Sequence, residues 1–185
     1  LRLNSAVTAD MGGTSFDVAT LQDGQPQLRT DRTLEFGLRV AVPCVDIQTV
    51  GIGGGSLAWL DESVAGGLQV GPQSAGALPG PACFGKGGRK PTVTDASLLL
   101  DRLVSDRIDL GLPPLDAKAA EQAMLAEVCS GFGMEPKDAA RMVLEVAEAG
   151  MAAFVRGQLM ARGMSPGKTT LIAFGGAGPV HAAPL

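Results

Sequence analysis

The sequence predicts an α/β fold in which a mixed sheet comes first in the chain and helices follow. Three features lead to this prediction: short alternating apolar runs in the first 50 positions, three helical patterns after residue 93, and an apolar run at residues 169–174 that ends in glycines. This order of elements is typical of a layered α/β domain. With 185 residues, 45% of them hydrophobic, the chain is long enough to bury a core of its own.

The first fifty residues predict an antiparallel meander. Residues 3–9 and 15–21 have the composition of short strands, and the sequence DMGGT joins them. The third strand is expected at residues 27–33, after a turn that contains the hairpin-favouring dipeptide Asp-Gly. A fourth strand is expected within residues 40–50.

A glycine-rich insertion is predicted at residues 51–93. Twelve of the 26 glycines of the chain lie between positions 51 and 88, a density that regular helices and strands tolerate poorly. We therefore expect loops with short strands at residues 57–60 and 68–70. Such a stretch is either a loop that covers a ligand or a structural surface insertion, and the residue pattern alone favours the second.

Two helices are predicted in the middle of the chain. The first spans residues 94–103 with Thr94 as its N-cap. The second spans residues 116–130, begins at the capping residue Asp116 and is stopped by Gly131.

A long third helix is predicted at residues 136–162, with Gly163 as the residue that ends it. Its expected apolar face contains Val143, Ala147, Met151 and Phe154. The apolar run at residues 169–174 then predicts a buried strand of the parallel type.

The turn between the first two strands has the composition of a phosphate-binding loop. Gly12 and Gly13 lack a Cβ, so the backbone can turn sharply and present N–H groups to an anion. Asp10 and Asp17 stand where Mg²⁺ could be held, directly or through water. No Gly-Lys-Ser/Thr follows, so the segment is not a P-loop, and a tight polar hairpin remains the alternative. The candidate nucleotide-binding residues of this turn are Gly12, Gly13, Thr14 and Ser15.

A second cluster of small residues follows the last strand. Gly175, Gly176, Ala177 and Gly178 would let a flat ligand such as adenine or ribose lie against the backbone. The alternative is a strand-to-helix turn that needs glycine for packing. Because the spacing is not GxGxxG, a dinucleotide-binding fold is disfavoured.

Other residues limit the function classes. Cys44, Cys83 and Cys129 are widely spaced and odd in number, which indicates reduced structural thiols in a cytoplasmic protein. A thiol nucleophile would need His181, the single histidine, as its base, and we expect that histidine to be satisfied or solvent-exposed instead. The net charge of −4 argues against a nucleic-acid partner. No apolar run approaches the roughly 20 residues that span a membrane.

Taken together, these segments resemble the hydantoinase A/5-oxoprolinase family. The matching stretches are DMGGTSFDVA (10–19), VPCVDIQTVGIGGGSLAWLD (42–61), the long block from 66 to 103, and LIAFGGAGPVHA (171–182). The resemblance implies an actin-like ATPase (ribonuclease H-like) fold, with residues 1–185 as one fragment of the hydantoinase A domain. It also implies that the Asp10–Asp17 hairpin binds phosphate and that Gly175–Gly178 is the adenosine motif.

The resemblance further implies an enzyme that uses ATP and Mg²⁺ to open a cyclic amide, such as a hydantoin or 5-oxoproline. An amide carbonyl is a poor electrophile, and phosphorylating its oxygen creates a good leaving group. Relatives carboxylate ketones with the same machinery, and a nucleotide-binding module without catalysis is a further alternative. A sugar or acetate kinase lacks the glycine-rich signature. The implied partner is a hydantoinase B-type subunit or a fused second half, in a hetero-oligomer.

Two departures from the family pattern bear on activity. Gln48 stands where family members usually carry a histidine, so it cannot supply proton transfer at neutral pH. Gln48, Gly53 and Gly54 are the candidate substrate residues. The family's actin-like unit has an earlier domain with its own DxGGT-type loop, and this chain has one such loop. We therefore expect the isolated chain not to turn over.

Overall fold

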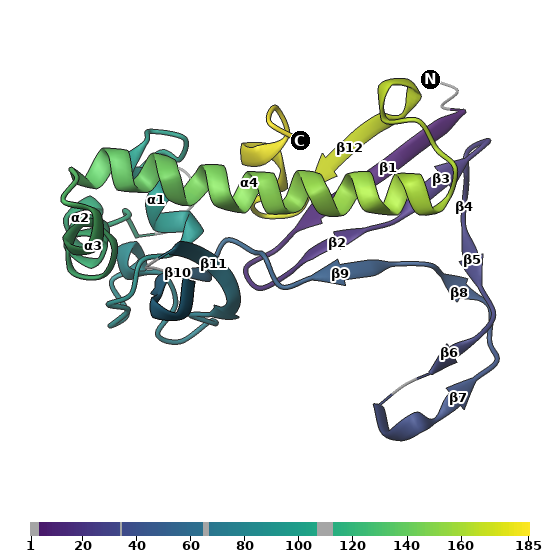
Figure 1. Ribbon diagram of the computed structural model, residues 1–185, viewed down its shortest axis with the longest axis horizontal. Helices are drawn as coiled ribbons and strands as arrows, with labels where there is room; N and C mark the ends of the chain where they lie inside the picture. The colour runs from purple at the N-terminus through teal and green to yellow at the C-terminus, as the bar shows by residue number, and fades with distance from the viewer. Residues whose placement is uncertain (1–3, 34, 65–66, 107–112) are drawn as a thin grey trace.

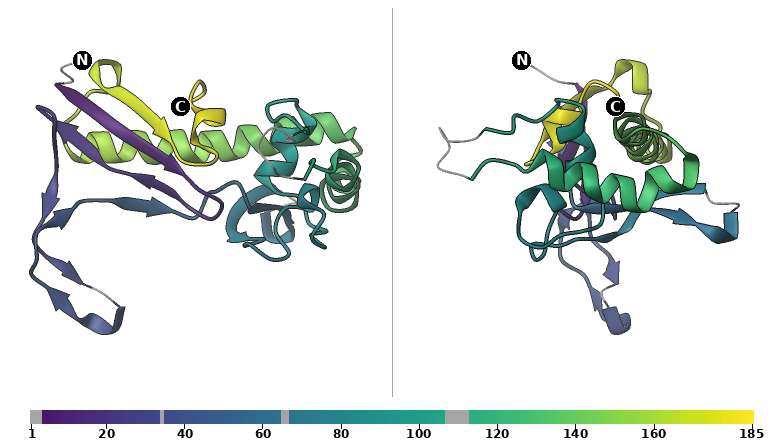
Figure 2. Two further views of the ribbon diagram at one scale, coloured as in Figure 1. Left: turned by 180° about the vertical axis from the view of Figure 1, so that it is seen from behind. Right: turned by 90° about the vertical axis from the view of Figure 1, so that its left-hand side faces the viewer.

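The computed structural model describes residues 4–33, 35–64, 67–106 and 113–185. Figure 1 shows a sheet and a smaller helical region that both lie along one long helix, α4 (Pro136–Ala161). The two further views in Figure 2 show a narrow ribbon of short strands projecting away from this body. The helix α4 therefore joins the two parts of the molecule into one unit.

β1 (Ser5–Met11) is the centre of the mixed sheet. On one side it pairs in parallel with β12 (Thr170–Phe174). On the other side it pairs antiparallel with β2 (Phe16–Val18) and β3 (Thr20–Gln22). β2 in turn pairs with β9 (Gln48–Val50).

The strand expected at residues 3–9 is confirmed as β1, which ends two positions later than predicted; residue 3 lies outside the described residues. The strand expected at residues 15–21 is two strands, because Ala19 leaves the ladder to bond with a side chain. Its N–H donates to Thr8 Oγ1 over 2.8 Å, while its carbonyl accepts from the Thr8 N–H over 2.8 Å. The hydroxyl of Thr8 thus separates β2 from β3.

The predicted Asp-Gly turn is confirmed. Gln22 pairs with Gln25, so β3 and β4 (Gln25–Pro26) are joined by two residues. Asp23 and Gly24 both have positive φ, 51° and 74°, as a type I′ hairpin turn requires.

The single strands expected at residues 27–33 and 40–50 are wrong, because each is broken into short pieces. Residues 27–33 and 35–47 form a projecting ribbon, which we call the arm (Figure 1). A two-stranded ribbon whose described strands pair only with each other has little to keep its ladder continuous. Its elements are β5 (Leu28–Arg29) paired with β8 (Cys44–Val45), β6 (Arg32–Thr33) paired with β7 (Arg39–Val40), and the helical turn η1 (Glu35–Gly37).

The glycine-rich insertion contains a hairpin of β10 (Ser56–Asp61) and β11 (Gly67–Ser74). It includes both short strands predicted at residues 57–60 and 68–70. The short helical turns outside the arm are η2 (Glu62–Val64), η3 (Ala82–Phe84), η6 (Pro166–Lys168) and η7 (Gly178–His181).

A buried carboxylate orders the end of this insertion. Asp95 is 0% exposed and accepts from the backbone N–H groups of Ala82 (3.2 Å), Cys83 (2.8 Å) and Thr92 (2.9 Å). It also accepts from the Thr92 hydroxyl over 2.7 Å. A buried charge is stable only when it is bonded in this way, so Asp95 joins η3 to the start of the next helix.

Asp95 also explains a correction to the first helix. α1 spans Val93–Leu99, and its N-cap is Thr92 in place of the predicted Thr94. Thr92 accepts from the Asp95 N–H while Asp95 bonds back to Thr92, which is a capping box. The predicted end at residue 103 is also wrong, because the helix stops at Leu99.

The second helix begins as predicted, since the Asp116 side chain accepts from the Ala119 N–H over 3.0 Å. Its end is not the predicted one, because Gly131 continues the helix and Gly133, with φ of +63°, ends it. The helix is continuous but contains a π-helical turn. Its parts are α2 (Ala117–Met124), η5 (Leu125–Cys129) and α3 (Ser130–Phe132).

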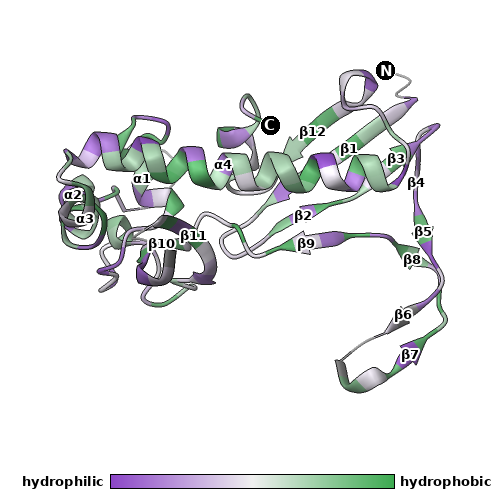
Figure 3. Ribbon diagram, in the orientation of Figure 1, coloured by the Kyte–Doolittle hydropathy of each residue, from purple (hydrophilic) through white to green (hydrophobic). Residues whose placement is uncertain are grey.

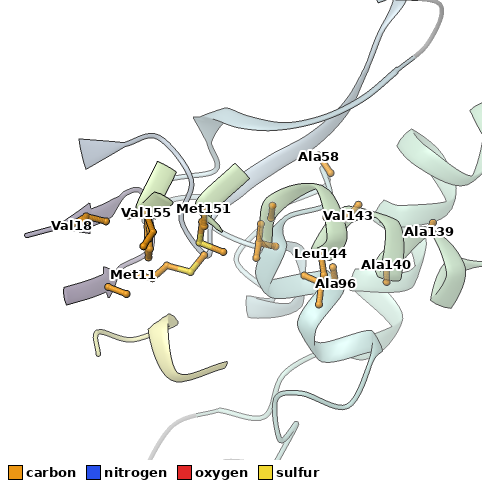
Figure 4. Packing of buried hydrophobic residues seen from close by; sticks show 14 of the residues in the cluster. Met11, Val18, Ala58, Ala96, Ala139, Ala140, Val143, Leu144, Met151 and Val155 are labelled. Carbon is orange, nitrogen blue, oxygen red and sulfur yellow. The ribbon is translucent and has the colours of Figure 1, made fainter. Parts of the chain in front are cut away.

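The long helix is confirmed as α4, which Gly163 follows with φ of +66°. Figure 3 shows that apolar and polar residues alternate along α4. Figure 4 shows buried residues of this helix beside those of the sheet and α1. Phe154 lies half-buried, with its ring 6.5 Å from that of Phe16 in an edge-on arrangement. The buried face includes Val143, Leu144, Ala147, Glu148, Met151, Ala152, Val155 and Leu159.

The last strand is parallel to β1, as predicted, but it is not buried. β12 has half-exposed central residues and exposed ends. Its only strand partner in the described part of the chain is β1, so it is an edge strand here. Within the described ranges, none of the helices is long and apolar enough to cross a membrane.

Candidate functional site

The two glycine clusters singled out in the sequence meet where β1 and β12 end. The strands are parallel, with Asp10 opposite Phe174, so their carboxyl ends lie side by side. Gly175 has φ of +87°, and a Cβ on it would stand 2.6 Å from the Met11 carbonyl oxygen. The Ala177 N–H donates to the same oxygen over 2.9 Å. Gly175 is therefore required for close packing.

A third glycine segment supports the turn at residues 12–14 from behind. The Gly54 N–H donates to the Gly12 carbonyl over 2.9 Å, and the Gly55 N–H donates to the Gly13 carbonyl over 2.6 Å. A Cβ on Gly53 would stand 2.6 Å from the backbone nitrogen of Thr14. Gly53 and Gly54 thus touch the predicted phosphate turn, and they hold its backbone in place.

Gly12, Gly13 and Gly176 differ from these packing glycines. A Cβ on any of the three would meet nothing within 4 Å, and none of them has a positive φ. Neither sterics nor backbone conformation demands glycine there. All three line one cavity, so their missing side chains leave the backbone open to whatever occupies it.

The cavity has a volume of about 650 Å³, within the range of small-molecule sites. Its lining combines bare backbone from the two turns with apolar side chains from the insertion, α1 and the segment that follows. The lining residues are Gly12, Gly13, Gly54, Phe84, Val93, Thr94, Ser97, Leu103, Val104, Asp106, Leu115, Gly176, Ala177, Val180 and His181. The insertion therefore contributes directly to the cavity, whatever its role on the outer surface.

Asp10 and Asp17 are register partners on β1 and β2, so their side chains lie on the same face of the sheet. That face is opposite to the one that packs on α4. Asp17 accepts from the Ser15 hydroxyl over 2.9 Å and from the Thr49 hydroxyl. Asp10 makes no hydrogen bond or ion pair with any described side chain. Neither carboxylate lines the cavity, although Asp10 Oδ1 lies beside the Gly175 turn.

Two carboxylates that face each other repel unless a cation or proton lies between them. The described ranges contain no group of three or more His, Cys, Asp or Glu side chains able to hold a metal. Mg²⁺, however, commonly uses one or two carboxylates and completes its shell with water and phosphate oxygens. The free Asp10 carboxylate beside Asp17 fits that donor set.

Two side chains missed by sequence reasoning, Glu148 and Arg102, form a cluster with His181 at the cavity. His181 is 1% exposed, and its Nδ1 lies 2.9 Å from Glu148 Oε1. The Arg102 guanidinium donates to the same carboxylate oxygen. The expectation that His181 would be satisfied is confirmed, but the ring also lines the cavity. Glu148 could have been noticed as a lone charge on the apolar face of the long helix.

With this geometry in place, the chain can be compared with known proteins. The family model described as hydantoinase/oxoprolinase matches residues 1–185, the whole chain. The chain belongs to this family. The hydantoinase/oxoprolinase chain is 38% identical over 179 residues to the caprolactamase subunit alpha of Pseudomonas jessenii, covering 97% of this chain and 25% of that protein. It is 38% identical over 185 residues to the acetophenone carboxylase gamma subunit of Aromatoleum aromaticum, a match that covers 100% of this chain and 25% of that protein.

Two solved structures agree with this assignment. The crystal structure of the ATP-dependent caprolactamase from Pseudomonas jessenii superposes with a TM-score of 0.85 at 38% identity, covering 98% of this chain and 26% of that one. The nucleotide-free structure of acetone carboxylase, described with ATP-dependent acetone carboxylation, superposes with a TM-score of 0.85 at 30% identity. That match covers 98% of this chain and 25% of the acetone carboxylase chain. The hydantoinase/oxoprolinase chain therefore has an actin-like ATPase fold, and it spans about a quarter of the length of these relatives.

Gln48, the predicted substrate residue, lies away from the cavity of this family member. Its Nε2 donates to Asp46 Oδ1 over 2.7 Å, and Asp46 Oδ2 accepts from Arg162 at the end of α4. Burial raises the pKa of Asp46, but the bonds from Gln48 and Arg162 outweigh that effect and leave the pKa below its usual 3.8. A role of Gln48 in substrate binding stays a prediction.

Proposed function

We propose that this chain provides the phosphate-binding and base-binding surfaces of a MgATP site in an enzyme that opens cyclic amides. The observation that carries the proposal is the open space at Gly12, Gly13 and Gly176 on one cavity. Packing explains Gly53 and Gly175 but leaves those three glycines without a structural reason. An approaching phosphate or nucleoside would supply one.

The triphosphate is assigned to the turn after β1. The backbone N–H groups of Gly13 and Thr14 have no acceptor within the described part of the chain, and the exposed Thr14 hydroxyl has no partner there. Free N–H groups on a tight turn form an anion-binding site. The Gly12 N–H is already bonded to the Ser15 carbonyl over 3.1 Å, which keeps the turn in shape.

The base is assigned to the apolar part of the cavity, against Gly176, Ala177 and Gly178. Gly178 packs close to β1, since a Cβ on it would stand 3.1 Å from the Ala9 carbonyl oxygen. Phe84 and Val93 line the same cavity. Flat apolar surfaces next to bare backbone suit an adenosine.

Asp10 and Asp17 are assigned to Mg²⁺, which when bound would neutralise phosphate charge as the phosphoryl group transfers. The Ser15 and Thr49 hydroxyls orient Asp17 and leave Asp10 free to bind the ion or its water. In the proposed reaction the amide oxygen attacks the γ-phosphorus as the bond to ADP breaks. Water then adds to the activated carbon and the ring C–N bond breaks, which leaves an amine and an acyl phosphate. A second water hydrolyses the acyl phosphate and releases phosphate and the carboxylate.

A calorimetric titration of the chain with MgATP tests the nucleotide site. Asp10→Asn is expected to weaken MgATP binding about tenfold, since it removes one charged metal ligand of similar shape. Asp23→Asn is the matched control, because Asp23 lies in the exposed β3–β4 turn. Failure of the unmodified chain to bind MgATP, or equal effects of the two variants, would refute the assignment.

The reaction itself has a second candidate. Relatives named as acetophenone and acetone carboxylases make an ATP-dependent ketone carboxylase the second candidate beside ring opening. ATP turnover by the protein in its full assembly, measured with hydantoin, 5-oxoproline, or acetone plus bicarbonate, separates the two. No turnover with any of them would favour a nucleotide-binding module. The isolated chain is expected to be inactive, so substrate-dependent turnover by these 185 residues would contradict that expectation.

A partner is proposed for the arm, in the form of a hydantoinase B-type subunit or a fused second half. Relatives of this chain are named as subunits. The arm exposes several large apolar side chains, Phe36 (99%), Leu38 (64%) and Val42 (59%) among them. Exposed apolar patches of this kind mark protein contacts. A Phe36→Ser, Leu38→Ser double variant that no longer co-purifies with the partner subunit would support the assignment. Unchanged co-purification with that subunit would count against it.

A further inference from the structure

His181 is a buried residue that also lines the cavity. It is 1% exposed, yet it lines the cavity. Its ring has one hydrogen bond within the described residues, from Nδ1 to Glu148 Oε1. Nε2 thus has no partner among the described residues. It is not fully enclosed either, since Thr20 Oγ1 is the sole described side-chain atom both fully enclosed and unbonded.

The surrounding charges define what Nε2 offers. A carboxylate can only accept, so the bond to Glu148 places the ring proton on Nδ1. Arg102 already balances the charge of Glu148. A neutral ring leaves Arg102, Glu148 and His181 with no net charge, whereas a protonated ring would add an uncompensated charge at a residue that is 1% exposed. Nε2 therefore presents a lone pair, a hydrogen-bond acceptor of fixed position.

We propose that His181 determines the base specificity of the nucleotide site by accepting a hydrogen bond from the exocyclic amino group of adenine. This inference rests on the proposed function above. The amino group is the donor that adenine offers on its ring edge, whereas guanine and hypoxanthine carry a carbonyl at that position. A carbonyl facing Nε2 would put two acceptors together and leave both without a donor, which is unfavourable.

The two hydroxyl groups that line the cavity do not make this distinction. Thr94 already donates its hydroxyl to the Gly54 carbonyl over 2.8 Å. The Ser97 hydroxyl can rotate to donate or to accept, so it suits either base. The ring of His181, in contrast, is held in one tautomer by a buried partner, which makes it a group able to reject the 6-carbonyl. Glu148 and Arg102 act through it as positioning residues.

The first test needs no substitution. The 185-residue chain is titrated with the magnesium complexes of ATP, purine riboside triphosphate, which has hydrogen at position 6, and inosine triphosphate, which has a carbonyl there. Loss of one hydrogen bond is expected to weaken the binding of purine riboside triphosphate about fivefold to tenfold relative to ATP. The binding of inosine triphosphate is expected to be weaker than that of ATP by more than about tenfold. Equal binding of all three would overturn the inference and leave the proposed function standing. No binding of any nucleotide would overturn both.

The single histidine of the chain provides a direct readout. In a ¹⁵N-labelled sample the two ring nitrogens can be assigned to His181 without ambiguity. The free chain is expected to show the Nδ1–H tautomer, and MgATP should shift the Nε2 resonance where purine riboside triphosphate does not. The opposite tautomer, or an Nε2 signal that ignores ATP, would refute the proposal.

Two variants complete the test. His181→Phe keeps a ring of similar size but removes the acceptor. In this variant the affinities for ATP and inosine triphosphate should lie within about threefold of each other. Ser97→Ala is the matched control at the cavity wall, and it should leave their ratio unchanged. A preference for ATP that survives in His181→Phe would refute the proposal, and the ¹⁵N measurement decides if that variant does not fold.

Discussion

Alanine substitutions at Gly13 and Gly53 test whether the turn after β1 is built for a ligand or for packing. At Gly53 a Cβ would lie 2.6 Å from the nitrogen and the carbonyl carbon of Thr14, two backbone atoms that cannot move alone. Overpacking of this kind costs about 1–3 kcal/mol. For a chain of this length, about 2 kcal/mol lowers Tm by roughly 4–8 °C.

At Gly13 the same methyl group meets nothing within 4 Å. Because φ there is not positive, alanine fits the backbone and restricts the unfolded chain, which stabilises by about 0.4–1 kcal/mol. Tm should therefore be unchanged or rise by roughly 1–4 °C. MgATP affinity should nevertheless fall by about tenfold or more, since the methyl group occupies space assigned to the phosphates.

Thermal unfolding followed by circular dichroism and calorimetric titration with MgATP measure the two effects on the same samples. The expected pattern is a crossed one: Gly53→Ala loses stability, while Gly13→Ala loses binding. If Gly13→Ala is as destabilised as Gly53→Ala, Gly13 is a packing residue. The tight polar hairpin would then replace the phosphate-binding turn as the explanation of this segment.

Three further predictions concern stability and thiol reactivity. Because the pKa of Asp46 is lowered in the folded chain, its ion pair with Arg162 stabilises the fold at pH values above the unfolded-state pKa. Asp46→Asn should therefore lower the free energy of unfolding, measured with urea, by about 1–2 kcal/mol at pH 7. The difference between the variant and the unmodified chain should vanish as the pH falls below 3.8. Asp95→Ala leaves buried N–H groups of the insertion unbonded and should cost about 3 kcal/mol or more, measured by denaturant unfolding. Burial, and to a smaller extent the charge of Glu135, raise the pKa of Cys129. In native protein at pH 8, Ellman's reagent should therefore modify the half-exposed Cys44 well before Cys129.

The outcomes of these tests are independent of one another. Asp46 joins the start of β9 to the end of α4, whereas Asp95 holds η3 against α1. Because the two sites share no partner, the two effects on stability should add. A double variant that departs from additivity by more than about 0.5 kcal/mol would indicate coupling through α4.

Local sequence signals predicted several elements correctly because short-range physics decides them. The Asp-Gly pair sets positive φ at Asp23 and Gly24, and Gly163 ends α4. The alternation of residues 5–11 buries Val7, Ala9 and Met11 on one face of β1. Each of these features depends on neighbours within a few positions, so the residue pattern is sufficient.

Other elements depended on partners far away in the chain. Thr92 displaced Thr94 as a helix cap because Asp95 must also bond to η3. The predicted strand at residues 15–21 broke at Ala19 because of the hydroxyl of Thr8 on the neighbouring strand. No local pattern contains these competitors, so sequence reasoning placed the elements correctly and their boundaries wrongly.

The same division holds for the candidate site. The sequence alone singled out the two glycine clusters and the Asp10–Asp17 pair as candidates, because glycine-rich turns can present backbone N–H groups to an anion and carboxylates can hold Mg²⁺. Only the tertiary structure separated Gly12, Gly13 and Gly176, which are open, from Gly53 and Gly175, which backbone atoms enclose. It alone brought Glu148 to His181, 33 positions apart, since a buried charge finds its partner through folding and not through spacing.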